Sequence, residues 1–351
     1  MKSTPLVSIV LTLFNSEKTV EAVLSSILAQ DFPLDKVELI IVDGGSRDRT
    51  LEIVNKFLLE NSHRFHSMKL IVHDRNYGVS KARNDGIKAS RGKYLLILDH
   101  DVILSGDTLR KSLEYMESSR KRFAAVIPLH QNLCSDFLAR WEYRIRKGKV
   151  TKGNAITSCA LLRRDLVNEI GFYDETLGPP LTVYEDIEYG ARALARGYEV
   201  HVVGFIEVLH NTCEEPRENT VISQHNYFAF VERVVKALKS LGDSRYRYAL
   251  KKYLRSSPGS EKLRWTIYSA LMLSAIPLLT LSLLSRSLSP SSIWILLTTL
   301  AYLDVLRYYW NGSLPHISIA YSAIAFAWRL LRSVMLLIPG PKLDVVLAGN
   351  S

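Results

Sequence analysis

The stretch from Lys93 to Leu104, KYLLILDHDVIL, constrains the fold more than any other part of the sequence. Five uncharged, mostly apolar residues, Tyr94 to Leu98, lead directly into Asp99, His100 and Asp101. A short continuous apolar run of this kind is typical of a strand buried on both faces of a sheet. The carboxylates then lie at the carboxyl end of the strand, which is the edge where open α/β sheets bind their ligands.

Asp99 and Asp101 are two positions apart, and residues with this spacing in a strand face the same side. The two carboxylates can therefore share one cavity and one hard cation, Mg²⁺ or Mn²⁺, which in turn holds a diphosphate. A strand followed by an ordinary polar turn explains the same residues without any ligand. The rest of the chain is needed to decide between these interpretations.

Strand-like and helix-like segments alternate before this stretch. Val7 to Phe14, Val37 to Val42 and Lys69 to Val72 are predicted strands because they are short, apolar and rich in β-branched residues. Helical spacing of apolar residues follows each of them, and the connections are short. This alternation predicts an α/β domain with a mostly parallel sheet wound with helices.

Each predicted strand ends in small or polar side chains, which include Thr12, Asn15 and Asp43. These ends build one polar edge, where a nucleotide would lie. Asp43 can accept hydrogen bonds from a base imide or a ribose hydroxyl, although an aspartate in this position also suits a helix N-cap. The sequence lacks both G-x-G-x-x-G after the first strand and a P-loop, which disfavours dinucleotide redox chemistry and ATP hydrolysis.

Five ordered motifs resemble the GT-A domain of family 2 glycosyltransferases. They are VSIVLTLFNSEKTVEAVLSSILAQ, ELIIVDGGSRDRT, NYGVSKARNDGIKASRGKYLLILDHD, SCALLRRDLVNEIGFYDETL and YEDIEYGARALARGYEV, and they cover roughly residues 7–210. The resemblance implies a Rossmann-like GT-A fold and an inverting transferase that uses a nucleotide-sugar donor.

The resemblance also implies roles for single residues. The donor-binding positions are Thr12, Asn15, Glu17, Asp43, Arg83, Asn84 and Asp99. The metal ligands for Mg²⁺ or Mn²⁺ are Asp99, Asp101 and His210, although a lone histidine at a strand end is commonly just a hydrogen-bonded or surface residue. Asp174 and Glu175 fall where family members contact the acceptor.

Glu185 and Asp186 precede the amphipathic segment IEYGARALARGY. Acids in the first turn of a helix are favoured by the helix dipole alone. In the family, however, the corresponding pair resembles the motif of the catalytic base, which a sugar hydroxyl needs because it is a poor nucleophile at neutral pH. The resemblance implies that Asp186 is the base, with Glu185 as the second choice.

The C-terminal part of the chain is strongly apolar and follows a basic region. Between Arg233 and Arg264, ten Lys or Arg residues stand against two acids, which is typical of a cytoplasmic segment beside a membrane. This location of the charge argues against nucleic acid as the partner. Trp265 to Ser285 has 21 residues without a charge, which predicts a transmembrane helix. The segments 293–306 and 317–338 are predicted as further spans, as in-plane helices or as buried helices of a soluble domain.

Three parts are therefore expected: a GT-A domain over residues 1–230, a basic juxtamembrane helical region over 231–264, and α-helical transmembrane or interfacial segments over 265–351. Three scattered cysteines favour a reducing compartment, and the apolar run Val7 to Phe14 is too short for a signal peptide. The protein is thus expected in the cell membrane, with a hairpin or multi-pass anchor and a cytosolic catalytic domain.

These observations predict a membrane-anchored glycosyltransferase that moves a sugar from a UDP- or GDP-sugar to a hydroxyl of a lipid-linked glycan, with a polyprenyl-linked acceptor at the cytosolic face. The alternative within the class is a polyprenyl-phosphate glycosyltransferase, whose acceptor already carries a charged nucleophile and needs no base. Outside the class, a metal-dependent sugar nucleotidyltransferase and a catalytically dead binding protein stay open.

Overall fold

The computed structural model describes residues 4–118, 123–133, 137–177 and 185–210, together with short stretches at 252–259, 263, 266–267, 270, 297–299 and 303. The chain divides into two compact units, residues 1–231 and 232–351. The site of interest lies in the first unit. The three-part division expected at residues 230 and 264 stays a prediction.

The expected location in the cell membrane is wrong. Crossing a bilayer takes a helix that is both long and continuously apolar, and the described residues contain no helix that meets both requirements. The predicted spans at 265–285, 293–306 and 317–338 lie almost entirely outside the described residues.

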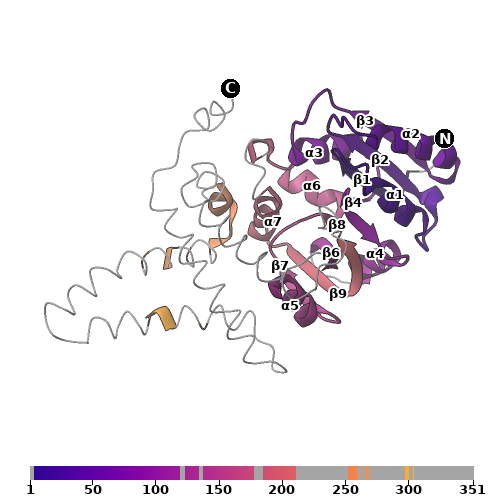
Figure 1. Ribbon diagram of the computed structural model, residues 1–351. Coiled ribbons are helices and arrows are strands. Elements are labelled where there is room, and N and C mark those ends of the chain that lie inside the picture. The colour runs from indigo at the N-terminus through magenta and orange to yellow at the C-terminus, as the bar shows by residue number, and fades with distance from the viewer. Residues whose placement is uncertain are drawn as a thin grey trace, which may run out of the picture. The chain divides into compact units, whose positions relative to one another are not determined.

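The first unit is built around a mixed sheet of nine strands (Figure 1). Eight of them follow the spatial order β3-β2-β1-β4-β8-β6-β9-β5, and β7 pairs with β9. The strands are β1 (Val7–Leu13), β2 (Val37–Asp43), β3 (Ser67–Val72), β4 (Tyr94–Asp99), β5 (Val102–Leu104), β6 (Phe123–Asn132), β7 (Val150–Gly153), β8 (Cys159–Arg163) and β9 (Glu199–His210).

The sheet is parallel only in part, which corrects the expectation of a mostly parallel sheet. Strands β1 to β4 pair in parallel, and so do β6 and β9. By contrast, β8 runs antiparallel to both β4 and β6, and β5 and β7 run antiparallel to β9. A strand buried on both faces has the same apolar pattern in either direction, so the sequence did not reveal this reversal.

Helices cover both faces of the sheet. On one face, buried side chains of the strands pack with those of α1, α2 and α4 in one core cluster. On the other face, they pack with those of α3, α6 and α7 in a second cluster. The helices are α1 (Val20–Leu28), α2 (Thr50–Asn61), α3 (Val79–Ala89), α4 (Thr108–Ser118), α5 (Phe137–Arg146), α6 (Arg164–Ile170) and α7 (Glu185–Ala195), with short 3₁₀ turns at Leu34–Lys36, Ser62–Arg64 and Glu175–Leu177.

The strand register brings polar residues together at one edge of the sheet. Thr12 of β1 pairs with Asp99 of β4, and Leu13 pairs with Asp43 of β2. β4 ends at Asp99, so Asp101 lies in the turn before β5 rather than on the same strand. The predicted polar edge is therefore present, but strand alternation does not explain how Asp101 reaches it.

Helix α7 packs unusually closely against the loop that precedes β8. A Cβ atom on Gly190 would lie 2.4 Å from the backbone oxygen of Asn154, which is far inside van der Waals contact. The amide of Ile156 donates a hydrogen bond to the backbone oxygen of Asp186, with 3.0 Å between nitrogen and oxygen. Together these contacts fix the first turns of α7 to the loop.

We expect the substitution Gly190→Ala to lower the free energy of unfolding by up to about 2 kcal/mol. Overpacking of a close contact costs about 1–3 kcal/mol, which outweighs the gain of about 1 kcal/mol that alanine brings to a helix. Chemical denaturation of the full chain would measure the change. Gly106→Ala is the matched control, because its Cβ would meet only the Ala29 oxygen at 3.4 Å. Equal stability of the two variants would contradict the prediction.

Candidate active site

A cavity of about 450 Å³ opens at the polar edge of the sheet. It receives side chains from the ends of β1, β4 and β9 and from the starts of α3 and α7, which are far apart in the sequence. The predicted site residues that line it are Thr12, Arg83, Asp99, Asp101, Glu185, Asp186 and His210.

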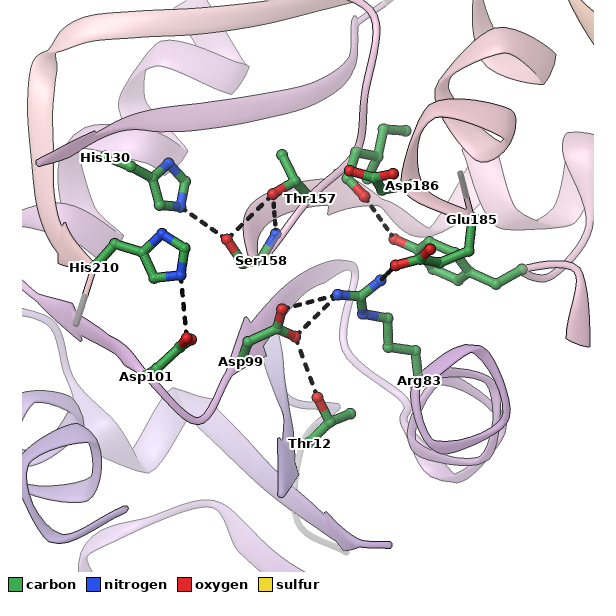
Figure 2. Close-up of polar contacts among 12 residues, drawn as sticks. Thr12, Arg83, Asp99, Asp101, His130, Thr157, Ser158, Glu185, Asp186 and His210 are labelled. Atoms are coloured by element: carbon green, nitrogen blue, oxygen red, sulfur yellow. Dashed lines mark hydrogen bonds and ion pairs between the residues drawn. The ribbon is translucent and has the colours of Figure 1, made fainter. Parts of the chain in front are cut away.

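Arg83 lies at the centre of this site, between two carboxylates (Figure 2). Its Nη2 donates to both oxygens of Asp99, at 3.0 and 2.9 Å, and its Nη1 lies 3.7 Å from Oε1 of Glu185. The Thr12 hydroxyl donates to Oδ1 of Asp99 at 3.2 Å. The charge on Asp99 is therefore matched within the protein.

The guanidinium of Arg83 is almost completely buried, with 2 % of the residue exposed. Burial opposes its positive charge, but the neighbouring Asp99, Tyr173 and Glu185 outweigh this effect and raise the pKa of Arg83. Its Nε and Nη1 have no hydrogen-bond partner within the described part of the chain. Buried donors without partners are costly, so these N–H groups favour an incoming acceptor such as a phosphate oxygen.

Glu185 and Asp186 form the first turn of α7, and both line the cavity. Burial raises the pKa of each carboxyl group, and the charge of Asp186 raises that of Glu185 further. Asp186 Oδ1 also accepts a hydrogen bond from the amide of Ile187 at 2.8 Å. A carboxylate that is reluctant to ionise is a stronger base than an exposed one, which suits proton abstraction near neutral pH.

Asp101 and His210 lie side by side on the other side of the cavity. His210 Nε2 is 3.2 Å from Asp101 Oδ2, and the hydrogen bond to His210 outweighs burial and lowers the pKa of Asp101. Asp99 is turned toward Arg83 instead (Figure 2). Within the described residues, no group of three or more His, Cys, Asp or Glu side chains is arranged to hold an ion.

Asp101 and His210 nevertheless fit two positions in the coordination shell of a divalent ion, with the other ligands supplied by the substrate and water. Two adjacent ligands of an octahedral ion with bonds of about 2.1 Å lie about 3 Å apart, close to the 3.2 Å between the Asp101 oxygen and the His210 nitrogen. Mg²⁺ sites commonly use one or two protein ligands and take the rest from phosphates and water. The carboxylate of Asp101, with phosphate and water oxygens, suits either Mg²⁺ or Mn²⁺.

Three of the predicted donor-binding residues organise the loops around the cavity. Asp43 is buried, and its carboxylate accepts hydrogen bonds from the amides of Gly45 and Ser46 and from the Ser46 hydroxyl. Asn15 accepts from the amide of Arg47 with its side-chain oxygen, and Glu17 accepts from the amide of Arg49. None of the three is among the described residues that line the cavity.

Asn84 and the two predicted acceptor residues also make contacts within the protein. The Asn84 side chain donates to the Tyr173 oxygen and to Glu175 Oε1, both at 2.9 Å, and accepts from the Tyr173 amide. Asp174 accepts from the amide and hydroxyl of Thr176. These contacts join α3 to the loop after α6, and the described lining of the cavity includes none of the three.

Several residues of the site were missed by sequence reasoning. Thr157 and Ser158 line the cavity just before β8, and Ser158 accepts the amide hydrogen of Asp99 with its backbone oxygen at 2.9 Å. The Ser158 hydroxyl lies 3.1 Å from Nε2 of His130, a partly exposed residue of β6 whose ring is desolvated enough to lower its pKa to about 4. Thr157 and Ser158 could have been predicted as site residues, because they form a polar pair directly before an apolar strand. No comparable sequence pattern marks His130.

The fold and this constellation can be compared with known proteins. Residues 8–171 match the model of Glycosyl transferase family 2. The match supports a family 2 glycosyltransferase domain in this part of the chain, and it ends before α7, which carries the paired acids.

Two curated relatives that match over shorter segments are at least 30 % identical to this chain. An uncharacterized glycosyltransferase of Haemophilus influenzae is 33 % identical over 112 residues, which cover 32 % of this chain and 42 % of the relative. A dolichyl N-acetyl-alpha-D-glucosaminyl phosphate 3-beta-D-2,3-diacetamido-2,3-dideoxy-beta-D-glucuronosyltransferase of Methanococcus voltae is 30 % identical over 115 residues, covering 33 % of this chain and 35 % of the relative. The chain thus spans less than half the length of either.

Among solved structures, the mannosyltransferase PcManGT of Pyrobaculum calidifontis, in complex with GDP-Man and Mn²⁺, shares the fold. The TM-score is 0.51 at 16 % sequence identity, and the alignment covers 95 % of this chain and 88 % of that one. At this identity the similarity establishes a GT-A-like fold and no more.

We expect Asp186→Asn to raise the thermal midpoint at neutral pH. Because burial raises the pKa of Asp186, the folded chain binds a proton more tightly than the unfolded chain, and ionisation above the ordinary pKa of about 4 therefore destabilises the fold. Asparagine removes this cost and keeps the oxygen that accepts from Ile187.

The gain in thermal midpoint should shrink as the pH falls through the raised pKa of Asp186 and vanish below the ordinary value of about 4, where Asp186 is protonated in both states. Differential scanning calorimetry over this range would measure it. Asp165→Asn, which removes a carboxylate with 57 % of its side chain exposed, is the control. A lower midpoint for Asp186→Asn at neutral pH would contradict the prediction.

Proposed function

We propose that the chain is an inverting glycosyltransferase that moves a sugar from a nucleotide-sugar donor to a hydroxyl group of a glycan. The observation that carries this proposal is one cavity at the sheet edge, in which Arg83 lies between Asp99 and Glu185 and burial raises the pKa of both Glu185 and Asp186. The family 2 match over residues 8–171 supports the reaction class.

The donor diphosphate would lie between Arg83 and the Asp101–His210 pair. The free N–H groups of Arg83 would bind its oxygens, and Thr12 and Arg83 would keep Asp99 oriented beneath it. Asp101 and His210 would hold a divalent ion, Mg²⁺ or Mn²⁺, which neutralises the charge of the leaving nucleoside diphosphate. The Mn²⁺ complex of the mannosyltransferase supports this assignment.

Asp186 would act as the general base, with Glu185 as the second choice. The acceptor oxygen forms a bond to the anomeric carbon while the bond from that carbon to the phosphate oxygen breaks, and the hydroxyl proton passes to Asp186. Glu185 stays close to Arg83 and is less available for a proton, since Nη1 of Arg83 lies 3.7 Å from its carboxylate. A single displacement of this kind inverts the configuration.

A lipid-linked sugar is the proposed acceptor. The Methanococcus voltae relative, by its name, acts on a dolichyl-linked N-acetylglucosaminyl phosphate, which carries sugar hydroxyl groups. A base is needed for such a hydroxyl and not for a bare polyprenyl phosphate, so the buried carboxyl pair favours the sugar-bearing acceptor.

The substitution Asp186→Asn should lower the rate of sugar transfer by about 10²-fold or more, because a positioned general base contributes about 10²–10⁴-fold. Nucleoside diphosphate release from UDP- and GDP-sugars would be measured with Mn²⁺ or EDTA and with a polyprenyl-diphosphate-linked sugar as acceptor. Glu185→Gln is the matched variant, and the smaller effect is expected there. Unchanged turnover of Asp186→Asn, or turnover with bare polyprenyl phosphate alone, would contradict the proposal.

The pH dependence of kcat/KM should report the ionisation of the general base. The base must be ionised to accept a proton, and burial raises the pKa of Asp186. The value of kcat/KM should therefore rise with pH through an apparent pKa above the ordinary aspartate value of about 4 and then level off. A profile with its acid limb at the ordinary value would show that the base is an exposed carboxylate instead.

A further inference from the structure

Two strands hold the backbone of His210 in place. β6 and β9 run in parallel, and a register shift between Pro128 and Leu129 brings Asn132 opposite His210. The amide of Leu133 donates to the His210 oxygen at 3.0 Å. On the other side, Val102 of β5 pairs with His210, which places it beside the turn that carries Asp101. The position of the imidazole is thus set by the sheet.

The side chain of Asn132 fixes the orientation of this imidazole. Its Oδ1 lies 2.9 Å from Nδ1 of His210. An amide oxygen can only accept a hydrogen bond, so Nδ1 is the donor in this contact. The opposite ring nitrogen, Nε2, then points at Asp101 Oδ2 at 3.2 Å, on the cavity side of the ring.

Nε2 of His210 and the Asp101 carboxylate oxygen face each other across 3.2 Å. Either a proton on Nε2 or a divalent ion can bridge the two atoms. When an ion binds, Nε2 gives it a lone pair while Nδ1 keeps its hydrogen bond to Asn132. Histidine ligands of metals are commonly held in the same way, with the second ring nitrogen donating to an oxygen.

The neighbouring ring of His130 adds no positive charge beside His210. The ring of His130 lies edge-on to that of His210, with 5.4 Å between the ring centroids. Burial lowers the pKa of His130 to about 4, so this residue is neutral, and the hydroxyl of Ser158 lies 3.1 Å from its Nε2. A divalent ion beside His210 therefore meets no second positive charge from this ring.

We propose that Asn132 is a positioning residue, which holds His210 in the Nδ1-protonated form and presents Nε2, together with Asp101, to the divalent ion of the donor diphosphate. The inference rests on the proposed function. Asn132 contacts neither the ion nor the donor, and acts only through the hydrogen bond to Nδ1.

The test measures Mn²⁺ binding by the full chain in the presence of UDP or GDP, using electron paramagnetic resonance to count free Mn²⁺. Asn132→Leu should weaken Mn²⁺ binding by about 10–100-fold, as losses of such supporting hydrogen bonds commonly do. Asn132→Asp keeps an acceptor oxygen opposite Nδ1 and should bind Mn²⁺ at least as tightly as the unsubstituted chain. Gln131→Leu is the matched control, since it makes the same kind of change at the neighbouring exposed residue.

A second readout separates positioning from a merely structural role. Pulsed measurements on the bound Mn²⁺ should detect coupling to an imidazole nitrogen in the unsubstituted chain, no coupling in His210→Gln, and reduced coupling in Asn132→Leu. Thermal midpoints would be recorded for each variant. An Asn132→Leu protein that is less stable but binds Mn²⁺ as before, with the nitrogen coupling intact, would overturn the inference.

Failure of the inference can be told apart from failure of the proposed function. If the unsubstituted chain transfers sugar but its Mn²⁺ shows no nitrogen coupling, or if it binds no Mn²⁺ at all while still transferring sugar, the role of Asn132 is refuted and the function stands. Mn²⁺ binding with nitrogen coupling but no transfer from any UDP- or GDP-sugar would contradict the proposed function instead.

Discussion

The buried ion pair between Arg83 and Asp99 is the interaction on which the site depends. It joins the start of α3 to the end of β4, and it brings a fully charged group into a space that excludes water. Removing one partner of such a pair leaves an uncompensated buried charge, which is strongly unfavourable. The remaining N–H groups of Arg83 are held beside the cavity only because Asp99 stabilises the guanidinium there.

The carboxyl groups around this pair differ in their charged partners and in the direction in which their pKa is shifted. Asp99 is matched by Arg83, Asp101 has its pKa lowered by His210, and burial raises the pKa of Glu185 and Asp186. Asp101 and the two acids of α7, which line one cavity, thus have pKa values that are shifted in opposite directions. Separation of this kind lets similar side chains serve in charge binding and in proton transfer.

Much of the first half of the fold could be predicted from the sequence. The apolar runs of β1, β2 and β4 and their polar ends are visible by eye, and parallel register brings those ends to one edge. The antiparallel insertion of β8 could not be predicted, because a doubly buried strand has no directional signal. The predicted edge residues Thr12 and Asp99 line the cavity, whereas Asp43 and Asn84 are used in hydrogen bonds that no sequence pattern distinguishes from ligand contacts. His130 and Asn132 could not be predicted as part of the site. Each acts through a residue that is distant in the sequence and becomes its neighbour only in the folded chain.

The close contact between Gly190 and Asn154 limits how the ligand specificity of the cavity can change. The loop at residues 154–158 and the first turn of α7 behave as one piece, since the backbone atoms of the loop touch the helix and Ile156 is hydrogen-bonded to Asp186. An insertion or deletion in this loop shifts the carboxyl group of Asp186 along with it. Recognition of new ligands is therefore more easily acquired through side-chain replacements on a loop of constant length than through remodelling of the loop itself.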